Sequence, residues 1–394
     1  MDKIDEVLTR RVDKIYPSKE ALEKILRSGK KIKLYLGIDP TGGDLHLGHA
    51  VPLMKLQEFV KLGHHVIFLV GNFTALCGDP SGHEGARKRL TPAQITKNMA
   101  TYKKQASKIL DFSKTEMKYN ADWLAKLSFA EIIKLASHFT VQQMIERSLF
   151  QRRLKAKKPI HLHEFLYPLL QGYDSVAMNV DLEMGGTDQT FNMLAGRTLQ
   201  KIYNKKEKFV LTTKMITGLD GKAMSKTSGN TVNILNDPND MYGKIMSLHD
   251  DLIIQYFEMC TNVPLQSIKA MEKDMRAGKI NPMDLKKKLA FEIVKMLHSE
   301  KDAKNAGKEF ERVFQKRKQP SEPPSYQATK KRYKIVDLLV DTRLASSKSE
   351  AKRLIERGGV DVDGKVMDDT QKVIRIKDGS IIRVGKRRFI KISA

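Results

Sequence analysis

Short apolar runs alternate with amphipathic helical stretches between about residue 32 and residue 235, and this alternation restricts the fold more than any other feature of the sequence. Four of the runs have the length and composition of buried strands: KLYLGID, HVIFLVGN, VDLEMGG and KFVLTTKMI. Helices between them begin at capping boxes, at Thr91 and at Ser128. A repeated order of strand, helix and strand predicts an α/β fold with a mostly parallel sheet.

Residues from about 236 to 318 show helical periodicity and no strand pattern. The clearest helix carries Asn281 as its cap and Pro282 at its first position, and its apolar residues recur at helical spacing. A linker rich in proline and lysine follows, and its prolines cannot continue a helix. We therefore expect a separate helical domain in this part of the chain.

The last 65 residues are strongly basic, with 18 Lys and Arg against 9 Asp and Glu. They predict a helix capped by Ser347, followed by two strand pairs that turn at Asp363-Gly364 and at Asp378-Gly379. A basic helix on a small sheet is typical of a domain that contacts a phosphate backbone, and the alternative is a charged face that contacts only solvent. The candidate RNA-binding residues are Lys348, Lys352, Arg353 and Arg357. The expected domains cover residues 1–235, 236–325 and 330–394.

The composition narrows the class of protein. Lys and Arg outnumber Asp and Glu by 71 to 46, and this net charge of +25 favours a polyanionic partner such as nucleic acid. A generally lysine-rich proteome is the alternative explanation. Only Cys77 and Cys260 are present, so neither a disulfide framework nor a cysteine zinc site is expected. No apolar run reaches the roughly 18 residues that a membrane span needs, and no export signal is recognisable, so a cytoplasmic protein is expected.

The stretch LYLGIDPTGGDLHLGHAVPL, residues 34–53, has the pattern of a strand, a glycine-containing loop and the start of a helix. Such a junction presents backbone N–H groups and the positive end of a helix dipole, which suit a phosphate. His46 and His49 lie one turn apart and can reach a polyphosphate together, while Gly48 lets a flat base approach the helix. A nucleotide is therefore the favoured ligand. The alternatives are a metal site, for which further ligands at a suitable spacing are missing, and a polar helix start without function.

A second segment, GLDGKAMSKTSGN, follows the last predicted strand. Lys222 and Lys226 lie there among small residues, so the loop can move and bring lysines to phosphates as charge grows in a transition state. The alternative is an ordinary charged surface loop. Together, HLGH and MSKT resemble the HIGH and KMSKS signatures of class I aminoacyl-tRNA synthetases, in the order and the Rossmann-like context of that family. Ala223 occupies the place of the family's first lysine, and Lys222, one position earlier, is the candidate substitute.

The segment YPLLQGYD puts Tyr167, Gln171 and Asp174 on one face of a predicted helix, within about 60°. These polar groups interrupt an otherwise apolar helix, so they either face solvent or line a binding site. The three positions match the YxxxQxxD pattern of tyrosyl-tRNA synthetases, in which the Tyr and the Gln hold the ammonium group of the amino acid and the Asp contacts its phenol hydroxyl. The resemblance covers essentially the whole chain.

The same resemblance implies roles for five further residues. Tyr35 is expected to share the phenol contact, and Asp79, in GDPSG, is expected to bind the ammonium group. In GGTDQ, Asp188 matches a residue that binds the adenosine ribose, and Gln189 matches one beside the α-carboxyl region of the substrate. Asp39 lies where the family contacts the amino acid. The expected tyrosine-binding set is Tyr35, Asp39, Asp79, Tyr167, Gln171, Asp174 and Gln189.

The resemblance implies a reaction in two steps: L-tyrosine and ATP give tyrosyl-adenylate, and the tyrosyl group then passes to tRNA(Tyr). Mg²⁺ is expected to arrive on ATP, and no protein-bound metal or organic cofactor is expected. His83 departs from the lysine that the family often has after GDPSG. A homodimer is also expected. The residues expected to stabilise the phosphates are His46, His49, Thr41 and Lys226, and those expected to bind ATP are Gly48, Asp188, Lys222, Lys226 and Arg87.

Three other functions are alternatives: a tryptophanyl-tRNA synthetase, a metabolic adenylyltransferase with HxGH chemistry, and an RNA-binding protein with an inactive synthetase body. The YxxxQxxD face and the basic tail argue against the first. An adenylyltransferase does not need a helical domain and an RNA-binding tail. The retained residues His46, His49, Asp174, Asp188 and Lys226 argue against an inactive protein.

Overall fold

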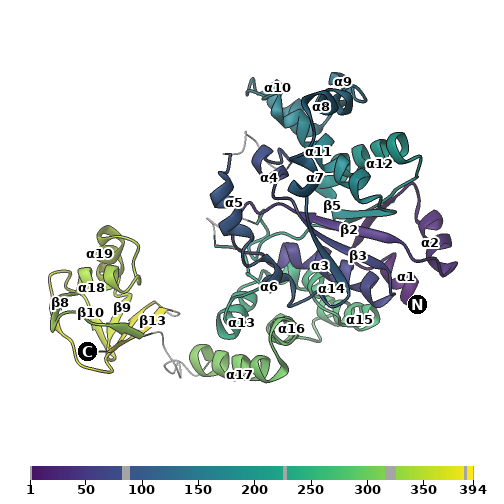
Figure 1. Cartoon of the computed structure of the whole chain (residues 1–394). Helices are drawn as coiled ribbons and strands as arrows, with labels where there is room; N and C mark the ends of the chain where they lie inside the picture. Colours follow the sequence, from purple (N-terminus) through teal and green to yellow (C-terminus); the bar gives the residue numbers. More distant parts are fainter. Residues whose placement is uncertain (1, 82–88, 225–228, 316–324, 386–387, 394) are drawn as a thin grey trace. The chain divides into compact units, whose positions relative to one another are not determined.

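The structure is a computed structural model, and it describes residues 2–81, 89–224, 229–315, 325–385 and 388–393. The chain divides into two compact units, Met1–Ala303 and Lys304–Ala394, which are considered separately (Figure 1). Within the described ranges, no helix is both long enough and apolar enough to cross a membrane.

A six-stranded sheet forms the centre of the larger unit, in the order β1-β6-β5-β2-β3-β4 (Figure 1). The outer strand β1 is antiparallel to β6, and all other neighbours are parallel, which confirms the predicted α/β sheet. Two strands were not predicted, because charged residues interrupt the sequences VDKIY of β1 and TEMKY of β4. The strands are β1 (Val12–Tyr16), β2 (Lys33–Ile38), β3 (His65–Val70), β4 (Thr115–Tyr119), β5 (Leu182–Gly186) and β6 (Phe209–Thr213).

The sheet reverses its winding direction at β2. The chain passes from β2 to β3 on one side, and β5 later pairs with β2 on the other. At such a point the carboxyl ends of two adjacent parallel strands leave a crevice that can hold a ligand. The connection from β2 to β3 and the connection from β5 to β6 run in opposite directions along the sheet. Because both are right-handed, their helices α3 (Leu47–Lys61) and α12 (Thr190–Asn204) lie on opposite faces of the sheet. The long helix α11 (His163–Met178) packs along α12 (Figure 1).

Capping residues set the starts of several helices as predicted. Thr91 and Ser128 both form reciprocal capping boxes, and the Asn281 side chain accepts a backbone N–H at the start of its helix. The other described helices of this unit are α1 (Lys3–Val7), α2 (Lys19–Arg27), α4 (Thr74–Cys77), α5 (Pro92–Met99), α6 (Tyr102–Ala106), α7 (Ala121–Leu124), α8 (Phe129–Ala136), α9 (Val141–Ile145), α10 (Ser148–Lys155), α13 (Pro238–Met246), α14 (Ile253–Cys260), α15 (Leu265–Arg276) and α16 (Pro282–Leu297), with 3₁₀ turns at Thr187–Gln189 and Asp250–Leu252.

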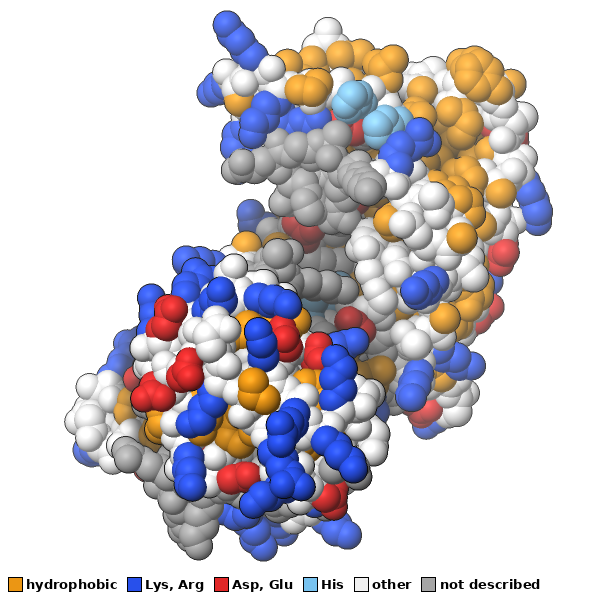
Figure 2. All heavy atoms as spheres, turned by 90° about the vertical axis from the view of Figure 1, so that its left-hand side faces the viewer, with side chains coloured by type: hydrophobic (Ala, Val, Ile, Leu, Met, Phe, Trp, Pro, Cys, Tyr) orange, Lys and Arg blue, Asp and Glu red, His pale blue; other side chains and the backbone are white. Residues whose placement is uncertain are grey.

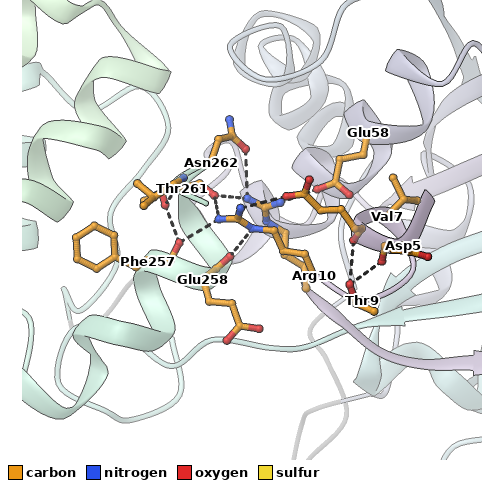
Figure 3. Close-up of polar contacts among 12 residues, drawn as sticks. Asp5, Val7, Thr9, Arg10, Glu58, Phe257, Glu258, Thr261 and Asn262 are labelled. Atoms are coloured by element: carbon orange, nitrogen blue, oxygen red, sulfur yellow. Dashed lines mark hydrogen bonds and ion pairs between the residues drawn. The ribbon is translucent and has the colours of Figure 1, made fainter. Parts of the chain in front are cut away.

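The segment after β6 is helical as predicted, but α13 to α16 belong to the same compact unit as the sheet. A pair of buried arginines near the amino terminus joins them to it (Figure 3). Arg10 donates to the Thr261 carbonyl at 2.6 Å, and Arg11 donates to the Met259 carbonyl at 2.8 Å and to Glu58 of α3 at 2.6 Å. The carbonyls at the end of α14 thus receive donors from the first residues of the chain.

The smaller unit contains a five-stranded sheet in the order β10-β9-β12-β13-β7 and a two-stranded sheet of β8 and β11. The hairpin predicted at Asp363-Gly364 is confirmed, because β9 and β10 pair across it. The second predicted hairpin is wrong: Asp378-Gly379 joins β11 to β12, which lie in different sheets, and β12 pairs with β13 instead. The elements are α17 (Glu300–Phe310, across the boundary), a π-helical turn at Glu311–Gln315, β7 (Ser325–Gln327), β8 (Arg332–Lys334), α18 (Ile335–Asp341), α19 (Lys348–Glu356), β9 (Val360–Val362), β10 (Lys365–Met367), β11 (Val373–Arg375), β12 (Ile381–Val384) and β13 (Arg388–Ser393).

Candidate active site

The glycine-containing loop after β2 is held by side chains from α6. The Tyr102 hydroxyl donates to the Gly42 carbonyl at 2.7 Å, and the Gln105 side-chain oxygen accepts the Leu45 N–H at 2.7 Å. Thr41, a predicted phosphate contact, is exposed in this loop. The loop therefore has a fixed path from the sheet into α3, although its sequence is short and polar.

His46 and His49 cap the first turn of α3 reciprocally. Nδ1 of His46 accepts the Gly48 N–H at 3.1 Å, and Nδ1 of His49 accepts the His46 N–H at 3.2 Å. The two ring centroids lie 4.0 Å apart. A neutral imidazole has one N–H and one acceptor nitrogen, so the use of Nδ1 as acceptor places the proton of each ring on Nε2. Each ring thus carries its donor on Nε2, at the positively polarised start of a helix.

The start of α3 lies beside described residues on either side of the gap at 225–228. The Leu47 N–H donates to the Val232 carbonyl at 3.0 Å, and a β-bridge pairs His46 with Asn233. A Cβ added to Gly48 would lie 3.1 Å from the Met224 sulfur, so this position favours glycine where the MSKT segment meets the helix. The start of α3 thus lies beside Met224 and beside Val232 and Asn233; residues 225–227 of MSKT lie outside the described residues.

Three predicted or discussed residues of the phosphate site cannot be placed. Lys226, Arg87 and His83 lie outside the described residues. Lys222 is exposed, and its backbone N–H donates to Asp220 at 3.1 Å, which fixes the start of the loop.

The polar face of α11 turns toward the carboxyl end of β2. The Tyr167 hydroxyl donates to Asp39 Oδ2 at 2.8 Å, and the Thr74 hydroxyl donates to Asp39 Oδ1 at 2.7 Å. An ideal Cβ at Gly71 would lie 1.9 Å from the same carboxylate oxygen, so only glycine leaves room for Asp39 there. Gln171 donates from Nε2 to Glu183 of β5 at 3.0 Å. Tyr167 and Gln171 thus face the protein interior, and the solvent-facing alternative does not apply to them.

Tyr35 and Asp174 lie in one buried cluster. Asp174 is 2% exposed and accepts N–H donors from Trp123 at 2.8 Å and from Asn120 at 3.2 Å. The Tyr35 hydroxyl is hydrogen bonded to Ser175, the residue next to Asp174, at 3.0 Å. The structure thus brings together the two residues predicted to read a phenol hydroxyl.

Burial shifts the ionisation of both groups. Desolvation, followed by the charges of Glu183 and Asp174, raises the pKa of Tyr35 well above its ordinary value, so its hydroxyl stays protonated. Desolvation also raises the pKa of Asp174, against the N–H donors of Trp123 and Asn120, which favour the carboxylate. A hydroxyl donor beside Asp174 would relieve the poor solvation of this carboxylate.

A second carboxylate, Asp79, lies at the amide of Gln189. Gln189 Nε2 donates to Asp79 at 2.7 Å and to Asp188 at 3.0 Å, and the Ser81 N–H donates to the other oxygen of Asp79 at 2.9 Å. Asp188 and Gln189 lie in the 3₁₀ turn that follows β5, and Asp79 lies after α4. The predicted residues of GDPSG and GGTDQ therefore meet from segments that follow β3 and β5, the two strands on either side of β2.

Five residues of this region were missed from the sequence. Asn120 directly follows β4, which was not predicted, and Trp123 is the only tryptophan of the chain. Arg147 donates to Ser81 at 2.9 Å, with its guanidinium between the rings of Phe150 and Phe191. Among these missed residues, Trp123 was the one that the sequence could have pointed to, because it is the single tryptophan of the chain. The remaining missed residues are Glu183 and Lys208, a buried ion pair.

Comparisons with known proteins agree with this geometry. The family described as "tRNA synthetases class I (W and Y)" matches residues 27–315, and the "Tyrosine--tRNA ligase SYY-like C-terminal domain" matches residues 315–392. The tyrosine–tRNA ligase of Thermotoga maritima is 46% identical and covers 98% of this chain and 96% of its own length. That of Moorella thermoacetica is 44% identical and covers 98% and 94%.

The chain belongs to the class I tyrosyl-tRNA synthetase family.

A solved structure of the same family is also similar. The C-terminally truncated mitochondrial tyrosyl-tRNA synthetase of Coccidioides posadasii superposes with a TM-score of 0.63 at 25% identity, and the match covers 78% of this chain and 91% of that one. The class I synthetase fold expected from the two signatures is therefore confirmed.

The smaller unit of this family member carries the predicted RNA-binding residues on α19. Ser347 caps this helix as predicted, and Ala351 and Ile355 are buried on its inner face. The four candidate residues are exposed, and the described surface of this unit is rich in Lys and Arg side chains (Figure 2). Lys348 forms an ion pair with Asp337 at 2.8 Å. The other three candidates are Lys352, Arg353 and Arg357.

Proposed function

We propose that this family member activates L-tyrosine with ATP, giving tyrosyl-adenylate and pyrophosphate, and then transfers the tyrosyl group to the 3′ end of tRNA(Tyr). One observation carries this proposal. The buried Tyr35–Asp174 cluster and the histidine-capped start of α3 both lie at the point where the sheet reverses direction. Polar groups suited to a phenol hydroxyl, at the end of what we propose as a tyrosine slot, thus lie near a junction suited to phosphate.

The slot selects tyrosine over phenylalanine because phenylalanine leaves a buried polar group of the protein without a hydrogen-bond partner. Tyrosine places its phenol hydroxyl beside Tyr35, where this hydroxyl donates a hydrogen bond to the Asp174 carboxylate. Phenylalanine leaves the Asp174 carboxylate buried without that donor, and a buried polar group without a partner costs about 1–3 kcal/mol or more. Tyrosyl-tRNA synthetase is itself a known example of this asymmetry between tyrosine and phenylalanine.

The other end of the slot holds the amino group. Tyr167, Asp39 and Gln171 face it from β2 and α11, and Asp79 and Gln189 face it from the loops above. An ammonium group has three donors, and the oxygen atoms of these side chains supply acceptors. Their hydrogen bonds to one another hold them in place before the ligand binds, which lowers the entropic cost of binding.

The activation step requires orientation and charge stabilisation. The tyrosine carboxylate is already ionised at neutral pH, and one of its oxygens attacks the α-phosphorus of ATP while the bond to pyrophosphate breaks, so no general base is needed. His46 and His49 are positioned to donate from Nε2 as negative charge grows on the phosphates. Mg²⁺ enters with ATP as part of the substrate. The further proposed contacts are Thr41 and Lys226 to the phosphates, and Gly48, Asp188, Lys222 and Arg87 to ATP.

The exposed basic residues of α19 support tRNA binding by the smaller unit. We also propose a homodimer in the cytoplasm. A set of exposed apolar side chains in the larger unit supports the dimer, and we call it the apolar patch: Phe129, Ile133, Val141, Leu154 and Leu162. The three predicted domains, at 1–235, 236–325 and 330–394, remain a prediction.

ATP–pyrophosphate exchange with each of the twenty amino acids tests the proposal. We expect exchange that depends on tyrosine and is weaker by orders of magnitude with phenylalanine or tryptophan. Exchange that depends on tryptophan would favour a tryptophanyl-tRNA synthetase instead. Loss of exchange with all twenty, in a chain that still binds tRNA, would favour an RNA-binding protein without catalysis.

A further inference from the structure

A fully buried ion pair lies directly behind the proposed tyrosine slot. Lys208 is 0% exposed and Glu183 is 1% exposed, and the lysine ammonium contacts the carboxylate. Lys208 also donates to the Ser175 hydroxyl at 2.8 Å. A Cβ added to Gly196 of α12 would lie 2.5 Å from the Lys208 nitrogen, so the glycine leaves room for this pair. The pair is thus a closely packed part of the fold.

The sheet register aims Glu183 at the slot. Glu183 of β5 is the direct partner of Tyr35 in β2, so both side chains lie on the same face of the sheet. One carboxylate oxygen accepts the amide N–H of Gln171 at 3.0 Å, and the other contacts Lys208 and accepts the Ser175 hydroxyl at 3.2 Å. Both oxygens are therefore used, one of them by a residue of the slot.

The Glu183 carboxylate determines the orientation of the Gln171 amide. An amide has an NH₂ donor end and an oxygen acceptor end, and they differ little in shape. An ionised carboxylate accepts but does not donate, so Glu183 holds the NH₂ end of Gln171 and repels its oxygen end. The Lys208 ammonium makes a charge-assisted contact with the other oxygen of the Glu183 carboxylate. The amide oxygen of Gln171 is then left for another donor.

We propose that Glu183, paired with Lys208, is a positioning residue that fixes the Gln171 amide with its oxygen toward the ammonium group of the amino acid. The inference rests on the proposed function, because it requires an amino acid in the slot. It gives the buried pair a role in specificity. Because Glu183 orients the Gln171 amide, the enzyme distinguishes an α-amino acid from an analogue that lacks the amino group.

A charge-neutral replacement, Glu183→Gln with Lys208→Met, tests the proposal. A glutamine at position 183 can donate or accept, so Gln171 can turn its NH₂ end toward the ligand. We measure binding of L-tyrosine and of 3-(4-hydroxyphenyl)propionate, which lacks only the amino group, by competition in tyrosine-dependent exchange. We expect the preference for tyrosine over this analogue to fall about ten-fold, which corresponds to one charge-assisted hydrogen bond. An unchanged preference in a folded, active variant overturns the proposal.

A second substitution separates amide orientation from packing. Added to the double variant, Gln171→Glu supplies two acceptor oxygens whose orientation does not matter, and we expect it to restore the preference for tyrosine. In the unaltered protein, the same substitution places two carboxylates together, and we expect it to weaken tyrosine binding. If Gln171→Glu has the same effect in both backgrounds, Glu183 does not act through Gln171, and the proposal fails.

The buried pair Arg153–Glu164 provides a matched control, since its side chains are 2% and 3% exposed. Arg153→Met with Glu164→Gln should lower the melting temperature but leave the preference for tyrosine over the analogue unchanged. If the Glu183 variants do not fold, Gln171→Met in the otherwise unaltered chain replaces them, and an unchanged preference there contradicts the proposal. Absence of tyrosine-dependent exchange in the unaltered chain refutes the proposed function instead.

Discussion

Asp174, the proposed acceptor of the phenol hydroxyl, is a side chain that is costly to bury. Its two oxygens accept from Trp123 and Asn120, and burial raises its pKa. These donors orient the carboxylate and leave lone pairs that a phenol hydroxyl can use. The preference for tyrosine therefore depends on an arrangement of donors that exists before the substrate binds.

We expect Asp174→Asn to reduce the ratio of kcat/KM for tyrosine over phenylalanine by at least about ten-fold. The NH₂ group of the new asparagine faces an N–H donor of Trp123 or Asn120, and the phenol hydroxyl of the substrate loses the carboxylate oxygen that accepts its hydrogen bond. Steady-state exchange with both amino acids measures the ratio. Asp181→Asn is the control, because Asp181 accepts the Lys33 N–H away from the slot. Equal ratios for Asp174→Asn and the unaltered chain would exclude the phenol contact.

Individual residues differ in how far the sequence could predict them. Tyr167, Gln171 and Asp174 share a helix face, and helical spacing alone brings such residues together. Their partners lie on other elements. Asn120 depends on a strand interrupted by charges, and Glu183 depends on a pairing between β5 and β2 that is far from local in sequence. Spacing cannot reveal contacts that only the strand order creates.

At the scale of elements, α3 combines a polar start with a buried lysine in its middle. Lys55 is 0% exposed, donates to the Val7 carbonyl at 2.7 Å and contacts Glu58. Desolvation lowers the pKa of Lys55 from 10.5 to about 8, although Glu58 opposes the shift. Helix α3, the amino-terminal segment and α14 meet at this charged cluster (Figure 3).

The depressed pKa of Lys55 gives a pH dependence of stability. Between its folded value near 8 and its unfolded value near 10.5, the unfolded chain binds more protons at this site, so its contribution to the free energy of unfolding rises with pH. We expect Lys55→Met to remove about 1 kcal/mol of that rise between pH 8 and 9. Denaturant unfolding at both pH values measures it.

The control for this measurement is Lys61→Met, which replaces an exposed lysine in the last turn of the same helix. The interval ends at pH 9 because Cys77 and Cys260, whose pKa values burial raises from 9.0 to about 12, begin to titrate there in the unfolded chain. A slope that is the same in Lys55→Met and in the unaltered chain contradicts the assignment.

Element prediction succeeded where local chemistry was decisive. The caps at Thr91, Ser128 and Ser347 were readable because a cap depends on residues three positions apart. The turn at Asp378-Gly379 was misread as a hairpin. Gly379 has a φ of +81°, as a turn requires, but a turn does not specify which strand its neighbour pairs with.

At the scale of the whole molecule, the proposed homodimer would use the apolar patch as its interface. Phe129 and Leu162 are 80% and 83% exposed, and hydrophobic side chains gather at the top of the larger unit in Figure 2. Exposed apolar side chains that gather on one face are unfavourable in a monomer and are common at interfaces between subunits.

If the proposed dimer forms through the apolar patch, Phe129→Ser with Ile133→Ser should shift it to monomer at micromolar concentration, because both substitutions replace exposed apolar side chains that this interface would bury. Sedimentation velocity measures the state. Val373→Ser, in the smaller unit, removes an exposed apolar side chain outside the patch and serves as the control. A dimer of unchanged strength in the double variant places the interface elsewhere, and a monomeric unaltered chain rejects the dimer.

The hydrogen bonds of Arg10 and Arg11 to the end of α14 link the amino-terminal segment to residues about 250 positions later in the chain. Strand β1 likewise finds its partner only in β6. On a translating ribosome, the amino-terminal segment emerges long before residue 261 has been synthesised. The side chains of Arg10 and Arg11 and the edge strand β1 therefore have no partners in the nascent chain until α14 and β6 have been synthesised. The larger unit can complete its fold only late in its translation.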